Sequence, residues 1–378
     1  MIDRRTLAVE LQSLGVRVEA GAGGPEGRRG GAGPSDAGFI WVAGMPLSVP
    51  LYGEYTSRSP YLLRLVAGAH VLYRGDERVG KIQLQPRPRY YELATADGIP
   101  YWKLALLHLD SLASTVVQRC IYYHTWEQCR FCGIELSLEA ERTIAVKKPE
   151  QLAEVALAAR DLDGAKDVTL TTGTVNRRDK GARYIARCAQ AIAEATGLPV
   201  QVQFEPPTEL AVLEEVKAAG VDAVGIHVET FDPDVLARVA PAKAAIGIDG
   251  YFRTWRKAVE LFGRGQVSTY VILGMGERPE LIEEGCKRAA DEGVYPFVVP
   301  LRPVPGTPMG DWLPPAPEYV ERMYRSVAPE LAARNLTSSA VRAGCARCQA
   351  CSAMSAFERG NGKDRIERRL PLLPSGTA

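Results

Sequence analysis

From about residue 112 onward, the sequence alternates short apolar runs with amphipathic helical segments, six times in succession. The runs are too apolar for strands that keep one face in water, so they predict a buried parallel sheet with helices outside it. Distinctive residues follow nearly every run, which favours a β/α barrel over a doubly wound sheet. The predicted fold class is therefore α/β, with a partial (β/α)6 TIM-like barrel. The expected strands are 114–118, 167–170, 200–204, 223–228, 267–273 and 295–301.

Four segments follow from this pattern. Residues 1–38 predict a short helix and a glycine-rich loop, residues 39–111 a small β-rich region, residues 112–315 the barrel, and residues 316–378 a helix and a cysteine-bearing tail. Within the β-rich region, Tyr90 to Tyr101 predicts a strand with a turn at Asp97-Gly98. The first half of the glycine-rich run is typical of a linker. Its second half, Arg29 to Asp36, is the better candidate for close contact with a ligand.

Composition excludes several function classes. Lys+Arg number 46 against Asp+Glu 45, so no net field gathers nucleic acid or an anionic membrane surface. No run approaches the length of a membrane span, and the start lacks an apolar leader, which predicts a cytoplasmic protein. In a reducing compartment, eight cysteines indicate metal binding or catalysis rather than disulfides.

Six of the eight cysteines form two tight triplets. Cys120, Cys129 and Cys132 follow the first barrel strand. Three thiolates can hold three irons of a [4Fe-4S] cluster and leave the fourth iron open, whereas a zinc site would take His124 as its fourth ligand. Residues Cys345, Cys348 and Cys351 form the second triplet, which predicts an auxiliary [4Fe-4S] cluster or a structural zinc site. Its fourth ligand could be Ser352, Ser355, a residue elsewhere in the chain or the substrate.

The remaining candidates are isolated residues. Cys188 and Cys286 share helix faces with apolar residues, so we expect core thiols. His70 and His108 are expected to be structural, whereas His124 could lie near the first cluster. His227 and Arg302 stand at predicted strand ends, where Arg302 could bind a carboxylate bidentately; Lys243 is a weaker candidate.

The cysteine loop, with Phe131 before its third cysteine, resembles that of the radical S-adenosylmethionine (SAM) superfamily. That family spaces its cysteines Cys-x3-Cys-x2-Cys, whereas eight residues fill the first gap here. The resemblance implies that SAM contacts Thr172, Gly173 and Thr174, which match the family's Gly-Gly-Glu stretch only in position. It also implies contacts with Glu205 and Glu229. Gly274 and Gly276 belong to a stretch that matches the family's Gly-x-Ile-x-Gly-x-x-Glu motif at all but its first position.

A closer resemblance is to the biotin synthase-related branch, carried by His227-Val-Glu-Thr230 and Pro300 to Pro308. It implies reductive cleavage of SAM to a 5′-deoxyadenosyl radical, hydrogen abstraction from a substrate C–H bond, and sulfur insertion from the auxiliary cluster. One version is lipoyl synthesis on an octanoyl chain. The alternatives are an oxidation or rearrangement with the second cluster transferring electrons, and a zinc-stabilised barrel that only binds a partner.

The same resemblance implies an electron donor of the ferredoxin or flavodoxin type. The substrate would be a small molecule or an acyl group on a carrier domain, and a second radical SAM protein could take part. Neither nucleic acid nor a membrane is expected as a partner.

Overall fold

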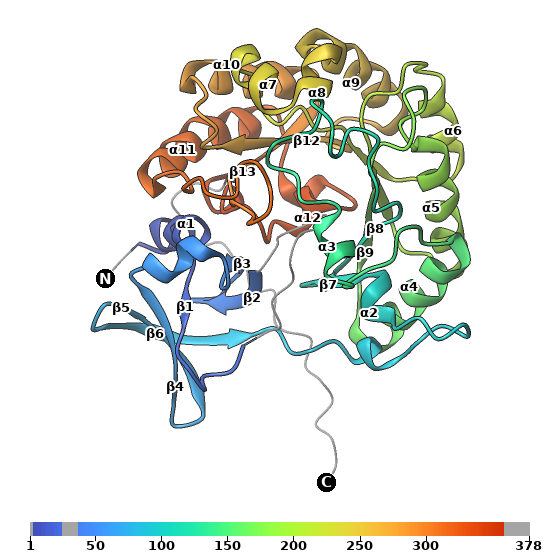
Figure 1. Ribbon diagram of the computed structural model, residues 1–378. Coiled ribbons are helices and arrows are strands. Elements are labelled where there is room, and N and C mark those ends of the chain that lie inside the picture. The colour runs from blue at the N-terminus through green and yellow to red at the C-terminus, as the bar shows by residue number, and fades with distance from the viewer. Residues whose placement is uncertain (1–2, 25–36, 359–378) are drawn as a thin grey trace.

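The computed structural model describes residues 3–24 and 37–358, and its largest element is a curved seven-stranded sheet (Figure 1). The strand order is β13-β12-β11-β10-β9-β8-β7, in which β8 to β13 run parallel and β7 is antiparallel to β8. β13 and β7 are its two edges, so the sheet is an open half-barrel. The strands are β7 Leu106–His108, β8 Ser111–Thr115, β9 Asp167–Thr171, β10 Val200–Gln203, β11 Ala223–Gly225, β12 Val267–Leu273 and β13 Val294–Pro300.

The two faces of this sheet differ in chemistry. One face is apolar and packs against the outer helices through residues such as Val168, Val202 and Val271. The other face turns toward the barrel axis and is largely polar. Its side chains include Ser111, Asp167, Thr169, Gln201, Gln203, Ser268, Tyr270 and Tyr295, several of which bond to one another or to the tail. A closed TIM barrel fills this space with bulky branched side chains. Here, both faces are buried as expected, but the inner one is polar.

Helices cross over between successive strands on the outside of the sheet (Figure 1). Proline at the first position starts several of them, where its missing N–H costs nothing. In α7 the Asp232 carboxylate caps the backbone N–H groups of Asp234 and Val235. The outer helices are α4 Pro149–Asp163, α5 Ala182–Thr196, α6 Val212–Ala218, α7 Pro233–Val239, α8 Pro241–Ile246, α9 Ile248–Phe262, α10 Pro279–Asp291 and α11 Pro317–Ala333. Cys188 and Cys286 are buried on α5 and α10, as expected.

The N-terminal region forms a second sheet beside the half-barrel, with strand order β1-β4-β5-β6-β2-β3. Helix α1 (Arg4–Leu14) packs against β3 and α11 and joins the sheet to the barrel. The strands are β1 Arg17–Val18, β2 Ala37–Val42, β3 Met45–Pro50, β4 Tyr61–Val66, β5 Ala69–Arg74 and β6 Glu77–Leu84. The second half of the glycine-rich run, Arg29 to Asp36, lies outside the described residues.

The prediction of a strand from Tyr90 was wrong, because residues Arg89–Glu92 form a 3-10 helix. The backbone N–H groups of Arg89 and Tyr90 donate to the Asp163 carboxylate at 2.8 and 3.0 Å, and the Tyr90 hydroxyl donates to the Ala105 carbonyl. These tertiary bonds override the β-propensity of the two tyrosines. The turn at Asp97-Gly98 is present.

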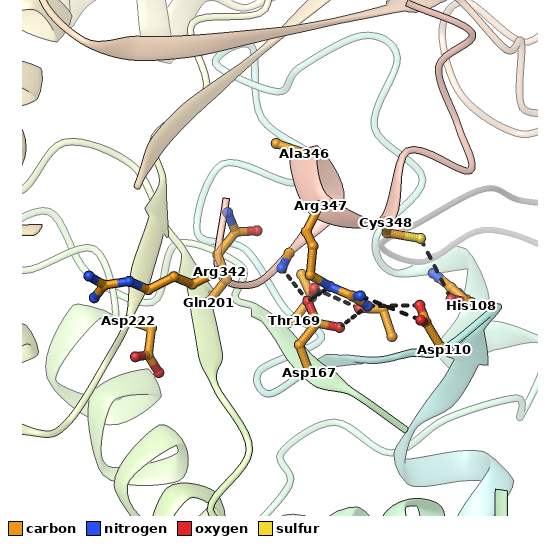
Figure 2. Close-up of polar contacts among 12 residues, drawn as sticks. His108, Asp110, Asp167, Thr169, Gln201, Asp222, Arg342, Ala346, Arg347 and Cys348 are labelled. Carbon is orange, nitrogen blue, oxygen red and sulfur yellow. Dashed lines mark hydrogen bonds and ion pairs between the residues drawn. The ribbon is translucent and has the colours of Figure 1, made fainter. Parts of the chain in front are cut away.

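The tail lies inside the curve of the large sheet, at the amino ends of its strands (Figure 2). Arg347, on the short helix α12 (Cys345–Cys348), donates to both carboxylate oxygens of Asp167 at 2.8 and 2.9 Å and to Asp110 at 2.7 Å. The Gly344 N–H also donates to Asp167. Gly344 has φ +97°, and a Cβ there would overlap the Gln201 side chain at 2.0 Å. The tail is therefore anchored to the polar inner face.

Among the described residues, no helix combines the length and the apolar character that crossing a lipid bilayer would require.

Replacing Arg347 by Met is expected to lower the free energy of unfolding by about 3–5 kcal/mol, because it leaves the Asp167 carboxylate buried without its cation. Asp167 has no exposed side-chain surface. Denaturant unfolding and limited proteolysis of the tail would measure the effect. The matched control is Arg183→Met, which breaks a half-exposed pair with Glu215 and should cost less than about 1 kcal/mol. Equal losses in the two variants would contradict the proposed anchor.

Candidate functional site

The first cysteine triplet lies on a loop that is fixed against the end of β9. The Ile121 N–H donates to the Thr174 carbonyl at 2.8 Å, and Thr174 also hydrogen-bonds the Cys120 thiol. Gly173 runs so close to this loop that a Cβ there would lie 2.0 Å from the Arg119 carbonyl oxygen. The glycine is therefore required by close approach of two backbones. The predicted stretch Thr172 to Thr174 is thus adjacent to Cys120.

The eight residues between Cys120 and Cys129 form an ordered insertion. Tyr122 is buried, and its hydroxyl accepts a bond from Lys180 at 2.9 Å. Glu127 forms a two-pronged ion pair with Arg177, whose guanidinium also lies over the Tyr122 ring. The insertion therefore packs on the segment that follows β9. Specific contacts hold the eight residues between Cys120 and Cys129, so they are not a flexible extension of the loop.

The other side of the loop contacts different elements. Cys129 and Cys132 enclose a turn in which the Cys132 N–H donates to the Cys129 carbonyl. The Arg130 N–H donates to the Val239 carbonyl at the end of α7, and the Arg130 carbonyl accepts from Met309, after β13. The end of α7 and the segment that follows β13 therefore hold this side of the cysteine loop in place.

A buried group of charges lies beside these cysteines. Lys243, on α8, pairs with Glu229 at 2.9 Å and donates to the His227 carbonyl at 2.7 Å. Glu229 has φ +70°, an unfavourable conformation for a residue with a side chain, and such strain often marks a functional position. The charge of Lys243 also acts on Cys129, together with the charges of Glu205 and Glu229. The structure therefore brings Glu205, Glu229 and Lys243 to the first triplet.

Three buried polar atoms in this group have no hydrogen-bond partner within the described chain: Glu205 Oε2, His227 Nε2 and Tyr251 OH. Leaving a buried polar atom unpaired costs about 1–3 kcal/mol, so such atoms are rare and point to a missing water, ion or ligand. Burial, reinforced by the Lys243 charge, lowers the pKa of His227 well below its usual value, so the imidazole is neutral. Together, these atoms fit a polar ligand bound beside the cysteines.

The predicted glycines after β12 form a second backbone edge of the site. Gly274 and Gly276 have φ +99° and +90°. A Cβ at Gly274 would meet the Pro315 ring at 2.8 Å. Glu277 holds the turn, since its two carboxylate oxygens accept from the N–H groups of Gly274 and Met275, both at 2.8 Å. The motif therefore shapes a tight turn.

Burial raises the pKa of all three thiols in the first triplet, that of Cys132 to about 12. The thiols are therefore protonated when no cation is bound, and iron would have to replace their protons. Across residues 3–24 and 37–358, no three Cys, His, Asp or Glu side chains are close enough to hold one metal ion. In a cubane cluster each thiolate binds a different iron, so its ligands stand farther apart than those of one zinc ion. A loop with three thiols suits such a cluster.

The second triplet also faces the inner side of the half-barrel. The Cys345 thiol accepts from Gln203 Nε2 at 3.6 Å and from the Tyr270 hydroxyl. Cys348 donates to the His108 carbonyl (Figure 2), and Cys351 accepts from the Ser48 hydroxyl. Burial raises the pKa of each thiol, that of Cys345 to about 11. The tail thus brings three thiols to the opposite end of the same interior.

Some predicted residues lie elsewhere than the sequence suggested. Arg302 donates to the Ser48 carbonyl at 2.7 Å and lowers the pKa of Cys351, so it lies at the tail triplet. Ser352 is fully buried and donates to the Val298 carbonyl, which leaves its hydroxyl engaged away from the cysteines. Tyr251, Tyr270 and Gln203 were missed. Alternate residues of a strand face the same side of a sheet, and this pattern along β10 and β12 could have indicated Gln203 and Tyr270. Nothing in the sequence distinguished Tyr251 from a core residue.

A cavity of about 700 Å³ lies outside the half-barrel, between the N-terminal sheet and β7. Aromatic residues, including Phe39, Tyr91 and Trp102, contribute to its lining. None of the predicted site residues is among the described residues that line it. His108 borders both this cavity and Cys348.

Substituting Gly173 by Ala is expected to reduce iron bound by the first triplet, because the added methyl would displace the backbone of Arg119 next to Cys120. Iron and sulfide analysis after anaerobic reconstitution would measure the loss, with circular dichroism to confirm the fold. Gly80→Ala is the control, since a Cβ there would meet nothing within 4 Å. Full iron content in the Gly173 variant would show that the close approach is unimportant.

Iron loading is expected to become more favourable as pH rises from about 7 to 9, because the thiols must lose protons whose release burial opposes. The thiol pKa values lie above the ordinary value of 9.0, so the protein is protonated at these positions throughout that range. Proton release during anaerobic reconstitution in weak buffer would measure the exchange. Replacing Cys188 and Cys286 by Ala should leave the release unchanged, and replacing Cys120, Cys129 and Cys132 should diminish it. Equal release in both variants would contradict the assignment.

The chain is similar to several known proteins. Residues 120–293 match the family described as the Radical SAM superfamily. The chain is 27% identical over 232 residues to bacteriochlorophyllide c C-7(1)-hydroxylase from Chlorobaculum limnaeum. The alignment covers 54% of this chain and 57% of the relative, so the chain spans little more than half of the relative's length.

Among solved structures, methylornithine synthase is 16% identical with a TM-score of 0.47, covering 71% of this chain and 77% of that chain. A radical SAM methyltransferase from Sphaerobacter thermophilus is 14% identical with a TM-score of 0.45, covering 75% and 76%. The biotin synthase-related branch stays a prediction. The matched region begins at Cys120 and includes the whole first triplet, so it is over residues 120–293 that the chain is similar to the Radical SAM superfamily.

Proposed function

We propose that this protein is a radical SAM enzyme with a second cluster on its tail, and that it converts a C–H bond of a substrate held between the two clusters. The observation that carries the proposal is the position of Cys345, whose thiol meets the inward side chains of Gln203 and Tyr270. One cysteine triplet lies at the carboxyl ends of the strands, and the tail that carries the other is anchored at the amino end of β9, where Arg347 pairs with Asp167.

At the carboxyl end, Cys120, Cys129 and Cys132 would hold the [4Fe-4S] cluster and leave one iron for SAM. The chemistry that such a cluster would supply when bound is one-electron reduction of SAM. The chain's own residues would bind and orient the cofactor. Lys243 offers a cation for its carboxylate, Glu205 and Glu229 offer acceptors, and the backbones at Gly173 and Gly274 allow close approach.

At the amino end, Cys345, Cys348 and Cys351 would hold the auxiliary [4Fe-4S] cluster. The side chains of Gln203 and Tyr270 donate hydrogen bonds to the Cys345 thiol, and that of Ser48 donates to the Cys351 thiol. The Arg302 guanidinium beside Cys351 favours the thiolate form. The tail anchor, Arg347 with the fully buried Asp167, lies next to this site and fixes α12, which carries Cys345 and Cys348.

For the product, we favour sulfur insertion from the tail cluster into the substrate carbon. The position of the tail triplet on the same interior as the first triplet supports this choice. Electrons for the first cluster would come from a ferredoxin or flavodoxin type of donor. An octanoyl chain on a lipoyl carrier domain, with a second radical SAM protein, is the version to test first, because a defined peptide can serve as its substrate.

A second candidate is oxidation, with hydroxylation as the outcome. It is favoured by the relative, which is named a bacteriochlorophyllide c C-7(1)-hydroxylase. In this case Cys345, Cys348 and Cys351 would hold a one-electron acceptor for the substrate radical, and water would supply the oxygen and release one proton to solvent. Product mass distinguishes the two candidates, because one adds sulfur and the other adds oxygen.

Reduced, anaerobically reconstituted protein is expected to convert SAM to methionine and 5′-deoxyadenosine. Changing Cys345, Cys348 and Cys351 to Ala should spare this cleavage and abolish product formation, because the tail cluster acts after the radical forms. Chromatography of 5′-deoxyadenosine and mass analysis of an octanoylated lipoyl-domain peptide would measure both steps. Cys188→Ala is the control thiol variant.

If the wild-type protein yields no 5′-deoxyadenosine, the proposed function fails. Loss of cleavage in the tail variant would instead make the tail structural. A peptide that gains oxygen would favour the second candidate, and an unchanged peptide alongside SAM cleavage would exclude the octanoyl version.

A further inference from the structure

The chemistry of the half-barrel's interior bears on the kind of molecule that fits between the two triplets. The inward positions of β9, β10 and β12 carry Thr169, Gln203 and Tyr270, and Gly225 ends β11 two residues before His227. His227 and Tyr270 are only partly buried, although they face the barrel axis. Solvent-sized molecules therefore reach this part of the interior. Its accessible walls carry polar groups.

His227 has a defined orientation and a defined tautomer. The Tyr270 backbone N–H donates to Nδ1 at 3.1 Å, so the proton of the neutral ring is on Nε2. A Cβ at Gly225 would lie 2.6 Å from His227 Cε1 and 3.0 Å from Nε2. The ring thus folds back over Gly225 toward the amino ends of the strands. The glycine makes room for it.

This orientation turns the His227 ring away from the carboxyl end, although the His227 backbone carbonyl accepts from Lys243. Lys243, Glu205 and Tyr251 interact with one another and with Cys129, at the carboxyl end. The Nε2 edge of His227 instead approaches the Gln203 side chain, which contacts Cys345. Nε2 has no acceptor within the described chain. A buried donor without an acceptor between the two triplets is a position for a ligand atom.

We propose that the substrate is a small polar molecule and that His227 Nε2–H donates a hydrogen bond to an oxygen acceptor on it. This inference rests on the proposed function and deepens it. An apolar chain would leave the donor unpaired, and a site built to hydrogen-bond its ligand rejects an analogue that lacks the acceptor. Within the proposed function, the interior therefore favours a small amide, carboxylate or hydroxyl substrate and disfavours the octanoyl version.

The test observes His227 directly in the full chain with oxidised clusters and isotope-labelled histidine. Only four histidines contribute signals, and His227→Phe identifies the one of interest. Acetamide, which carries a carbonyl acceptor, is expected to shift the His227 Nε2 resonance saturably and to leave His70, His108 and His124 unmoved. Xenon, which enters apolar cavities, should leave His227 unmoved.

Gly225→Ala should abolish the acetamide shift, because the added methyl displaces the ring, whereas Gly80→Ala should retain it. A shift with xenon and none with acetamide overturns the proposal, and so does the absence of any acetamide shift in the wild-type chain. Cleavage of SAM without an acetamide response would defeat this inference alone. An acetamide response without cleavage would defeat only the proposed function.

Discussion

The Asp167 carboxylate is the fixed point on which the architecture depends. It is fully buried at the first position of β9, and such a charge is tolerable only when it is paired and hydrogen-bonded. Its partners, Arg347 and the Gly344 N–H, both come from the tail. The polar inner face of the sheet therefore needs the tail in order to be a stable interior. The same contact positions the second cysteine triplet.

Much of the fold follows from the sequence because its signals are local. Apolar runs and proline-initiated helices placed the strands and helices of the half-barrel to within a few residues. The exception is at Tyr90, where the Asp163 carboxylate on α4 accepts hydrogen bonds from two backbone N–H groups. Part of the site was also predicted, because some of its signals are local. Cysteine spacing and strand-end glycines are local patterns, whereas the pairing of Arg347 with Asp167 joins residues 180 positions apart.

The missed site residues share a physical cause. Gln203 and Tyr270 gain their meaning from facing a cysteine near the end of the chain, so no window of sequence contains the interaction. Tyr251 resembles a core tyrosine until its hydroxyl is found buried without a partner in the described chain. The eight-residue gap, unexplained by spacing, is accounted for by packing, since Tyr122 and Glu127 bond to Lys180 and Arg177. A family spacing can thus vary when the extra residues have their own partners.

The carbonyl of Ala350 links the tail to α1 and to the N-terminal sheet. It accepts hydrogen bonds from Gln12 on α1 and from the Ser48 N–H on β3, while neighbouring tail residues contact the half-barrel. These contacts involve a segment that the ribosome makes after every strand of both sheets. During synthesis, the polar inner face and the first cysteine triplet are therefore made before the tail that packs against that face. The order of translation thus makes the first triplet available to iron before the second triplet exists.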